Sequence, residues 1–348
     1  MRYQNVRLRA FGYELPPRVL SSAEIETRLT PVYERLKLPP GRLELMSGIR
    51  ERRLWTPHTR PSAAAAAAGR KAIAAAGVAP ADLECLIFAS VSRDMLEPAT
   101  AAFVHRELGL PPRCLIFDIS NACLGFLDGM VMLANMLELG QMQTGLIVAG
   151  ETAEDLIEST LAALLANRTL TRKSIKSSFA SLTIGSGAVA LVMERTPAAA
   201  DRRLVGGTFL ANTAHNDLCQ GGVTDNGHRE TASTLMATDS EELLLRGIET
   251  AETAWRNFLA ELGWQTESID AFFCHQVGSA HARQLLTTLN LDPRKNFETL
   301  PYLGNVGSVS APITMAIGLE QGILRPGQRA ALLGIGSGIN CMMLGIEW

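Results

Sequence analysis

A single cysteine in the segment DISNACLGF has the setting of a nucleophile. Cys123 stands between an apolar, strand-like run that ends near Asp118 and an apolar, helix-like run that begins near Leu124. A thiol at a helix N-terminus gains from the helix dipole, and a nearby imidazole adds to that effect. The pKa of Cys123 is therefore expected to fall from about 8.5 toward the reactive range. The thiolate could accept an acyl group as a thioester.

Three further polar residues could assist this chemistry. His275 follows the apolar run AFFC, Asn305 lies among glycines in YLGNVGSVSAP, and Glu97 lies in the polar loop SVSRDMLEP. His275 and Asn305 can donate hydrogen bonds to a thioester oxygen as it becomes an enolate, and the backbone N–H groups of Cys123 and Ser337 can form a second oxyanion hole. Each residue taken alone is more often structural, and it is their combination that indicates an acyl-transfer site without a metal.

These residues occupy matching places in a duplicated pattern. The segment IGSGAVALVME at 184–194 closes one half, and IGSGINCMMLGIEW at 335–348 closes the other. Each half runs through a strand, a polar loop, a second strand, a glycine-flanked strand-to-helix junction and the IGSG turn. We therefore predict an N-terminal half at residues 1–195 and a C-terminal half at 196–348. Their polar loops and junctions should meet at the same strand ends, in one cleft.

The elements that position the site indicate an α/β protein. Short apolar runs at 85–92, 114–120, 145–151 and 188–194 predict strands that alternate with helices. The alanine-rich stretch 63–77 predicts a helix with Ser62 as its N-cap, and the polar stretch 194–203 predicts a linker.

The two halves differ in length after the junction. The stretch from Cys123 to the first IGSG turn is about twice as long as the stretch from Asn305 to the second, and much of the excess falls within 152–180. An insertion beside a reactive junction often forms a lid, a pocket wall or a subunit contact. An ordinary surface elaboration is the alternative.

Composition limits the class of protein. The chain has 348 residues, of which 47% are hydrophobic and 19% charged, so it can bury a large core. Its net charge of -3 gives no electrostatic reason to expect nucleic acid or an anionic membrane as a partner. No uncharged apolar run approaches the roughly 20 residues that span a bilayer, and the first residues lack the pattern of a signal peptide. We therefore expect a cytoplasmic protein.

The cysteines and one basic segment bear on metal and ligand binding. The six cysteines lack the spacing of zinc ligands or of a disulfide framework, and we expect Cys85 and Cys341 to be small buried hydrophobes. In GIRERRLW, the residues Arg50, Arg52 and Arg53 could bind an anionic small molecule, although a solvated charged face would look the same.

In the segments around Cys123, His275 and Asn305 the chain resembles the thiolase superfamily of carbon–carbon condensing enzymes, in the ketoacyl-ACP synthase III branch. The segments SNACLGF, HQVGSAH, YLGNVGSVSAP and LLGIGSGIN fall in the family's order over essentially the full length. The resemblance implies the thiolase fold, with five layers αβαβα and two pseudo-symmetric halves, and a homodimer. It also implies that the family's catalytic triad falls on Cys123, His275 and Asn305.

Several details are similar to the OleA-type thiolases, acyltransferases that join two fatty acyl-CoA molecules head to head in bacterial long-chain olefin biosynthesis. The synthase motif HQAN, followed two residues later by arginine, has Gly278 and Ala280 at the differing positions here, which disfavours docking of a carrier protein. The tryptophan that the synthase often stacks on adenine aligns near Arg42. The glutamate of the OleA pattern falls on Glu97, and in such enzymes it reaches the neighbouring subunit's active site.

The resemblance implies a reaction. Cys123 takes the first acyl chain, and Glu97, as a partly buried carboxylate with a raised pKa, deprotonates the second acyl-CoA. The carbanion then attacks the acyl-cysteine, and hydrolysis releases a 2-alkyl-3-oxoalkanoic acid, a β-keto acid, and CoA. CoA thioesters are the substrates, with Arg50, Arg52 and Arg53 available to the CoA phosphates, and no cofactor is expected. A reductase and a β-lactone synthetase are the implied downstream partners.

Three other functions remain open. A ketoacyl-ACP synthase III would condense acyl-CoA with malonyl-ACP and lose CO2. A thioesterase or acyltransferase would pass the acyl group from Cys123 to water or to another nucleophile. A noncatalytic subunit of a condensing complex would have no chemical need for Cys123, His275, Asn305 and Glu97 together, which argues against this third function.

Overall fold

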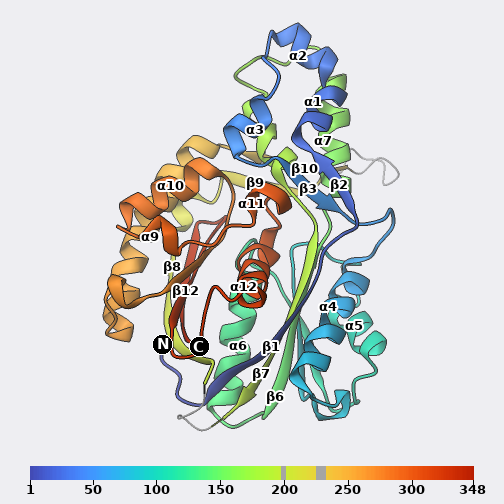
Figure 1. Cartoon of the computed structure of the whole chain (residues 1–348). Helices are drawn as coiled ribbons and strands as arrows, with labels where there is room; N and C mark the ends of the chain where they lie inside the picture. The colour runs from blue at the N-terminus through green and yellow to red at the C-terminus, as the bar shows by residue number, and fades with distance from the viewer. Residues whose placement is uncertain (197–200, 225–232) are drawn as a thin grey trace.

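Nine strands form the central sheet of the computed structural model, which describes residues 1–196, 201–224 and 233–348 (Figure 1). Their order across the sheet is β11-β12-β13-β8-β1-β7-β6-β4-β5. The first half of the chain contributes β1 (Val6–Glu14), β4 (Cys85–Ala89), β5 (Leu115–Ile119), β6 (Thr144–Glu151) and β7 (Gly187–Arg195). The second half contributes β8 (Arg203–Ala211), β11 (Ala271–Cys274), β12 (Arg329–Gly336) and β13 (Asn340–Glu347).

The strand order occurs twice, as the repeated IGSG segments predict. In the first half β4 pairs in parallel with β5 and β6, whereas β6, β7 and β1 are antiparallel neighbours. In the second half β11 pairs in parallel with β12, and β12, β13 and β8 are antiparallel neighbours. An isolated bridge between Phe272 and Asn296 stands where the first half has β5. Each polar loop and its counterpart in the other half therefore follow equivalent strands.

Helices separate and cover the two halves of this sheet, which gives five layers (Figure 1). The outer helices are α4 (Pro61–Ala76) and α5 (Thr100–Leu108) on one side, and α9 (Ser240–Leu262) and α10 (Ser279–Thr288) on the other. The middle layer holds α6 (Gly125–Glu138) and α12 (Ser310–Glu320). Nine consecutive residues at the start of α12 are buried, because this helix has protein on every side. The largest apolar cluster fills this layer.

The predicted strands are confirmed with small differences at their ends. The run 85–92 ends as a strand at Ala89, because Ser90 onward forms a loop. The alanine-rich helix begins at Pro61, a residue favoured in a first helical turn since it lacks an N–H group. Ser62 is therefore not the N-cap, and its N–H and hydroxyl groups both donate to Asp94 instead. Residues 197–200 of the predicted linker lie outside the described residues.

A cap of short elements lies above one end of the sheet (Figure 1). Its members are β2 (Arg18–Ser21), α1 (Ser22–Arg28), α2 (Thr30–Leu36), α3 (Arg42–Ser47) and β3 (Glu51–Leu54). The insertion predicted at 152–180 forms α7 (Glu154–Ala166) and α8 (Lys176–Phe179), which pack into the same apolar cluster as α1 and α2. The paired strands β9 (Cys219–Thr224) and β10 (Ser233–Thr238) lie beside α7.

None of the helices in the described ranges combines the length and the apolar character that crossing a bilayer would require. Cys85 and Cys341 are fully buried among apolar side chains, which confirms the prediction that they are small core residues.

Candidate active site

Cys123 lies in the turn that joins β5 to α6. Ala122 adopts a left-handed conformation with φ of 45°, and α6 begins two residues after the cysteine. Such strained positions cost about 1–3 kcal/mol and gather at functional sites. The Asn121 amide donates to Asp128 in α6 (2.9 Å), and its oxygen accepts from Asn340 (3.1 Å). The turn is therefore held from both halves of the chain.

The end of β12 completes the surroundings of the sulfur. The backbone N–H groups of Cys123 itself and of Ser337 act on the Cys123 sulfur to lower its pKa and so favour its thiolate. Gly336 lies so close that a Cβ atom there would be 3.6 Å from both Cys123 Cβ and Cys123 N. Asn340 donates to the Ser337 carbonyl oxygen (3.1 Å) and so joins this turn to Asn121. The two N–H groups predicted for an oxyanion hole thus both influence the Cys123 sulfur, and the oxyanion hole itself stays a prediction.

The pKa of Cys123 is raised, contrary to the expectation from the sequence. Burial is the largest cause and raises it to about 12, and charges on Cys219 and Glu151 add to the rise. The two backbone N–H groups act in the opposite direction but do not offset burial. Cys123 is therefore a neutral thiol at pH 7.

His275 follows β11 and is held against the neighbouring strand β12. Its backbone N–H donates to the Leu333 carbonyl oxygen (2.7 Å), which places His275 beside the strand that leads to Ser337. Both ring nitrogens of His275 are buried without a hydrogen-bond partner among the described residues. Burial lowers the pKa of His275 to about 4, and His281 contributes to the decrease. The imidazole is therefore neutral at pH 7 and has no charge with which to lower the thiol pKa, but a neutral ring still has one N–H group to donate.

Asn305 is anchored to the first half of the chain. Its backbone N–H donates to Thr183 (3.0 Å), and its carbonyl oxygen accepts from Gly185 in the first IGSG turn (2.8 Å). Its side-chain oxygen accepts from the Gly307 N–H (3.1 Å), so the Nδ2 group points the other way and remains available as a donor. At Gly304, with φ of 71°, a Cβ atom would lie 2.7 Å from the Thr183 carbonyl oxygen. A larger residue there would displace Asn305.

Glu97 is exposed in the single chain and makes no hydrogen bond or ion pair with Cys123, His275 or Asn305 among the described residues, so the shared cleft stays a prediction. It lies in the loop between β4 and α5, and residues 95–98 at the tip of this loop are all exposed. The base of the loop is well anchored: the Ser62 N–H donates to Asp94 (2.9 Å), and the Thr100 N–H donates to Asp118 (2.7 Å). The expected partial burial of Glu97 is absent from the single chain. The tip of the loop, with Glu97, is thus exposed while its base is held in place.

Glu151, at the end of β6, is a site residue that the sequence analysis does not identify. It is 5% exposed, and its charge contributes to the raised pKa of Cys123. Its carboxylate accepts hydrogen bonds from residues of the Glu97 loop and of the turn after Asn305. A single glutamate at the end of an apolar strand gives no local signal of burial, because its donors are distant in the sequence.

The three arginines of the basic segment have different environments. Arg52 is fully buried and donates to the Leu20 carbonyl oxygen (3.2 Å) and to the Ser22 hydroxyl (3.1 Å), so its predicted contact with a phosphate is wrong. Its position in β3 alternates with partly exposed neighbours, and the side chain points into the cap. Arg53 is partly buried and donates to the Pro16 carbonyl oxygen (3.2 Å). Arg50 is exposed and stays a candidate.

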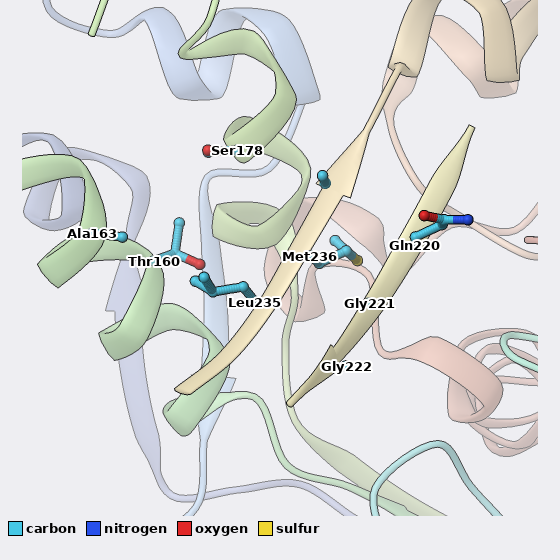
Figure 2. A pocket seen from close by; sticks show the side chains of 9 residues that line it. Thr160, Ala163, Ser178, Gln220, Gly221, Gly222, Leu235 and Met236 are labelled. Atoms are coloured by element: carbon cyan, nitrogen blue, oxygen red, sulfur yellow. The ribbon is translucent and has the colours of Figure 1, made fainter. Parts of the chain in front are cut away.

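A cavity of about 440 Å³ lies between the insertion and the β9–β10 pair (Figure 2). Thr160 of α7 lies next to Leu235 of β10, whereas Met236 points to the other side of β10, toward β9. The insertion is therefore a pocket wall, one of the roles expected for it. Gln220, the residue after Cys219 in β9, also lines the pocket, and Cys219 is one of the groups that raise the pKa of Cys123.

Family models and two relatives of known name match this chain. The family models of 3-oxoacyl-[acyl-carrier-protein (ACP)] synthase III and of its C-terminal part match residues 117–212 and 259–348. Two relatives named acyl-CoA:acyl-CoA alkyltransferase, from Shewanella oneidensis and Xanthomonas campestris pv. campestris, are 43% and 38% identical over 100% of this chain and 100% of their own length.

A solved structure has the same fold. Cerulenin-bound OleA from Xanthomonas campestris superimposes with a TM-score of 0.94 at 38% identity, covering 100% of this chain and 98% of that chain. Further structures of that protein have a cysteine, a glutamate or a histidine replaced. The predicted thiolase fold, with its five layers and two pseudo-symmetric halves, is confirmed.

The raised pKa of Cys123 makes a prediction for alkylation by iodoacetamide. Because only the thiolate reacts, the rate at Cys123 should rise about tenfold per pH unit from about pH 6 to about pH 9 without a plateau. His275 should add no step in this range, since its pKa lies at about 4. Mass spectrometry of the Cys123 peptide measures the rate, and a Cys123→Ser variant gives the background. A plateau at or below about pH 8 would contradict the raised pKa.

Proposed function

Because the chain belongs to the acyl-CoA:acyl-CoA alkyltransferase family, within the 3-oxoacyl-[acyl-carrier-protein] synthase III group of the thiolase superfamily, we propose that Cys123 is the acyl acceptor in a head-to-head condensation of two fatty acyl-CoA molecules. The reaction is a non-decarboxylative Claisen condensation, and the protein is an acyltransferase. The observation that supports the role of Cys123 is that the backbone N–H groups of Cys123 and Ser337 both act on its sulfur to favour the thiolate.

In the first half-reaction the Cys123 sulfur attacks the carbonyl carbon of one acyl-CoA. The new sulfur–carbon bond replaces the bond to CoA, and the thiol proton ends on the departing CoA sulfur. The N–H groups of Cys123 and Ser337 stabilise the oxyanion of the tetrahedral intermediate. Since the resting thiol is neutral, proton loss accompanies the attack instead of preceding it.

In the second half-reaction a base removes an α-proton from another acyl-CoA, and we assign this step to Glu97. The Asn305 amide and the N–H of the neutral His275 imidazole donate to the enolate oxygen. The carbanion attacks the acyl-Cys123 carbonyl carbon, so a carbon–carbon bond forms as the bond to Cys123 breaks. Water then cleaves the remaining thioester. Two acyl-CoA and one water give a 2-alkyl-3-oxoalkanoic acid and two CoA.

Glu97 serves the site of a second copy of the chain in this proposal. The edge of β5 that does not face β4 has no partner strand among the described residues, and an open edge is a ready surface for strand pairing. Exposed apolar side chains lie on β5 at Leu115 and, at Val91, Met95 and Leu96, in the loop whose end is bound to Asp118 of β5; Leu96 is 93% exposed. A homodimer formed at this edge would bury them and carry Glu97 to the neighbouring Cys123.

The cavity in Figure 2 is the proposed place for part of an acyl chain. Leu235, Met236 and Ala163 give it an apolar wall, and it lies next to the strand that begins at Cys219. The released β-keto acid retains a ketone, so an enzyme that reduces it and a β-lactone synthetase are the proposed downstream partners. We also propose that the protein works in the cytoplasm, where its CoA thioesters are available.

Incubation with myristoyl-CoA alone tests the reaction. The coupled β-keto acid loses CO2 on heating, so extracts should contain a ketone of two chains less one carbon. Glu97→Ala should retain the acyl mass on Cys123 but lose the ketone by a factor of about 10²–10⁴, the usual contribution of a general base. Cys123→Ala should lose both.

Acyl-Cys123 without ketone from the unaltered protein, together with ketoacyl-ACP and CO2 from malonyl-ACP, would instead favour the synthase reaction. Acyl-Cys123 that only hydrolyses, at the same rate in the unaltered protein and in Glu97→Ala, would favour a thioesterase.

Mixed dimers test whether Glu97 acts in the neighbouring site. Co-expressed Cys123→Ala and Glu97→Ala chains, each inactive alone, should recover about a quarter of the unaltered activity, because half of the dimers are mixed and each holds one intact site. Separate affinity tags allow the mixed dimer to be isolated. Failure of an isolated mixed dimer to make ketone would place Glu97 in its own chain's site.

Narrowing the cavity tests its role. Leu235→Trp fills space between α7 and β10, so kcat/KM should move toward shorter acyl-CoA substrates across a series from about eight to sixteen carbons. Leu245→Trp is the matched control, since Leu245 is exposed on α9 and does not line the cavity. An unchanged chain-length profile in Leu235→Trp would exclude the cavity as the acyl pocket.

A further inference from the structure

Glu151 is a buried carboxylate that is fully supplied with hydrogen-bond donors. One oxygen accepts from the Val91 N–H (2.9 Å) and from the Ser308 hydroxyl (2.8 Å). The other accepts from the N–H (3.0 Å) and the hydroxyl (2.8 Å) of Ser92. A buried acid without such donors would be strongly destabilising. The four contacts make Glu151 a rigid junction.

The donors belong to two loops of the proposed active site. Val91 and Ser92 begin the loop whose tip carries Glu97, and Ser308 lies in the turn that follows Asn305. The turn approaches the carboxylate closely: a Cβ atom at Gly307 would lie 3.2 Å from Glu151 Oε1. The Ser92 hydroxyl also accepts from the Thr152 N–H (3.0 Å), which closes the network onto the residue after Glu151.

The Cys123 turn packs against the same network. The Ser308 hydroxyl is within hydrogen-bonding distance of the Ala89 carbonyl oxygen (2.8 Å) as well as of Glu151. A Cβ atom at Gly125, the first residue of α6, would lie 3.5 Å from that same carbonyl oxygen. The junction at Glu151 is thus adjacent to all three turns, although it makes no hydrogen bond to Cys123 or Ser337 within the described part of the chain.

We propose that Glu151 is a positioning residue for carbon–carbon bond formation, which holds the Glu97 loop and the Asn305 turn of one chain in a fixed relation. The inference rests on the proposed function, because Glu97 and Asn305 are needed for the second half-reaction and not for acylation of Cys123. In a dimer, Asn305 serves its own site whereas Glu97 serves the neighbouring one. Glu151 therefore joins the two active sites of the dimer.

Glu151→Gln tests this role, because it preserves shape but replaces an acceptor oxygen with an NH2 group that faces N–H and hydroxyl donors. Acylation of Cys123 by myristoyl-CoA, followed by mass spectrometry in single turnover, should fall by no more than about threefold, because loss of the Glu151 charge lowers the pKa of the Cys123 thiol and does not hinder its attack. Ketone formation from the acylated protein should fall by about 10–100-fold, as misplaced reacting groups cause. An equal fall in both steps would overturn the proposal.

Glu138→Gln is the matched control. Glu138 also accepts from two backbone N–H groups, those of Gln4 (3.0 Å) and Asn5 (2.8 Å), but it lies at the far end of α6, about 20 Å from Cys123. Both steps should keep their rates in this variant. If Glu151→Gln does not fold, Ser308→Ala removes one donor and should lower ketone formation relative to acylation in the same direction; unchanged ketone formation there would overturn the proposal.

Mixed dimers test the effect of Glu151 on the Glu97 loop and on the Asn305 turn separately. In a dimer of Cys123→Ala and Glu97→Ala chains, Glu151→Gln on the first chain affects the loop that delivers Glu97 to the intact site. On the second chain it affects the turn that carries Asn305 of that site. The proposal requires a loss of at least about threefold from either placement. A loss from only one placement, or from neither, would overturn it.

The unaltered protein, run in parallel, separates this proposal from the function on which it rests. If the unaltered protein makes no ketone, the proposed function fails. If it makes ketone and Glu151→Gln does so equally well, only the role of Glu151 fails.

Discussion

The active site depends on a close approach between the start of α6 and the end of β12. Gly334 and Gly336 have no side chain, so Leu124 and Cys123 of the first half lie directly against a strand of the second: a Cβ atom at Gly334 would fall 2.5 Å from Leu124 Cδ2. The glycines at the end of β12 thus let the two halves meet with the nucleophile between them. A larger residue would separate Cys123 from the Ser337 N–H.

Burial determines the chemistry that this contact permits. It keeps the Cys123 thiol and the His275 imidazole neutral, so the resting site is not a thiolate–imidazolium pair. The same exclusion of water strengthens hydrogen bonds from fixed backbone N–H groups to charge that develops during the reaction. The site is thus organised to stabilise an oxyanion as it forms instead of storing a reactive anion beforehand.

A single chain is an incomplete enzyme in the proposed mechanism. Its nucleophile is partly buried at the strand ends, as are the donors His275 and Ser337, whereas its base lies at the exposed tip of an anchored loop and one edge of the sheet is open. The buried Glu151 holds the base of this loop although the tip is exposed, because its carboxylate accepts from the N–H groups of Val91 and Ser92, where the loop begins. The hydrogen bonds of Glu151 inside one chain would then fix the position of Glu97, which acts in the active site of the other chain.

The sequence by itself determined the duplicated α/β order, the strand positions and the junction at Cys123, because periodicity and glycine spacing are local properties of the chain. Only the tertiary structure decided the burial of Arg52 and Glu151, the exposure of Glu97 and the directions of the pKa shifts. These depend on desolvation and on partners such as Ser308 for Glu151, which lie far away in sequence. A local pattern specifies an element, whereas the charge state of a side chain is set by everything packed around it.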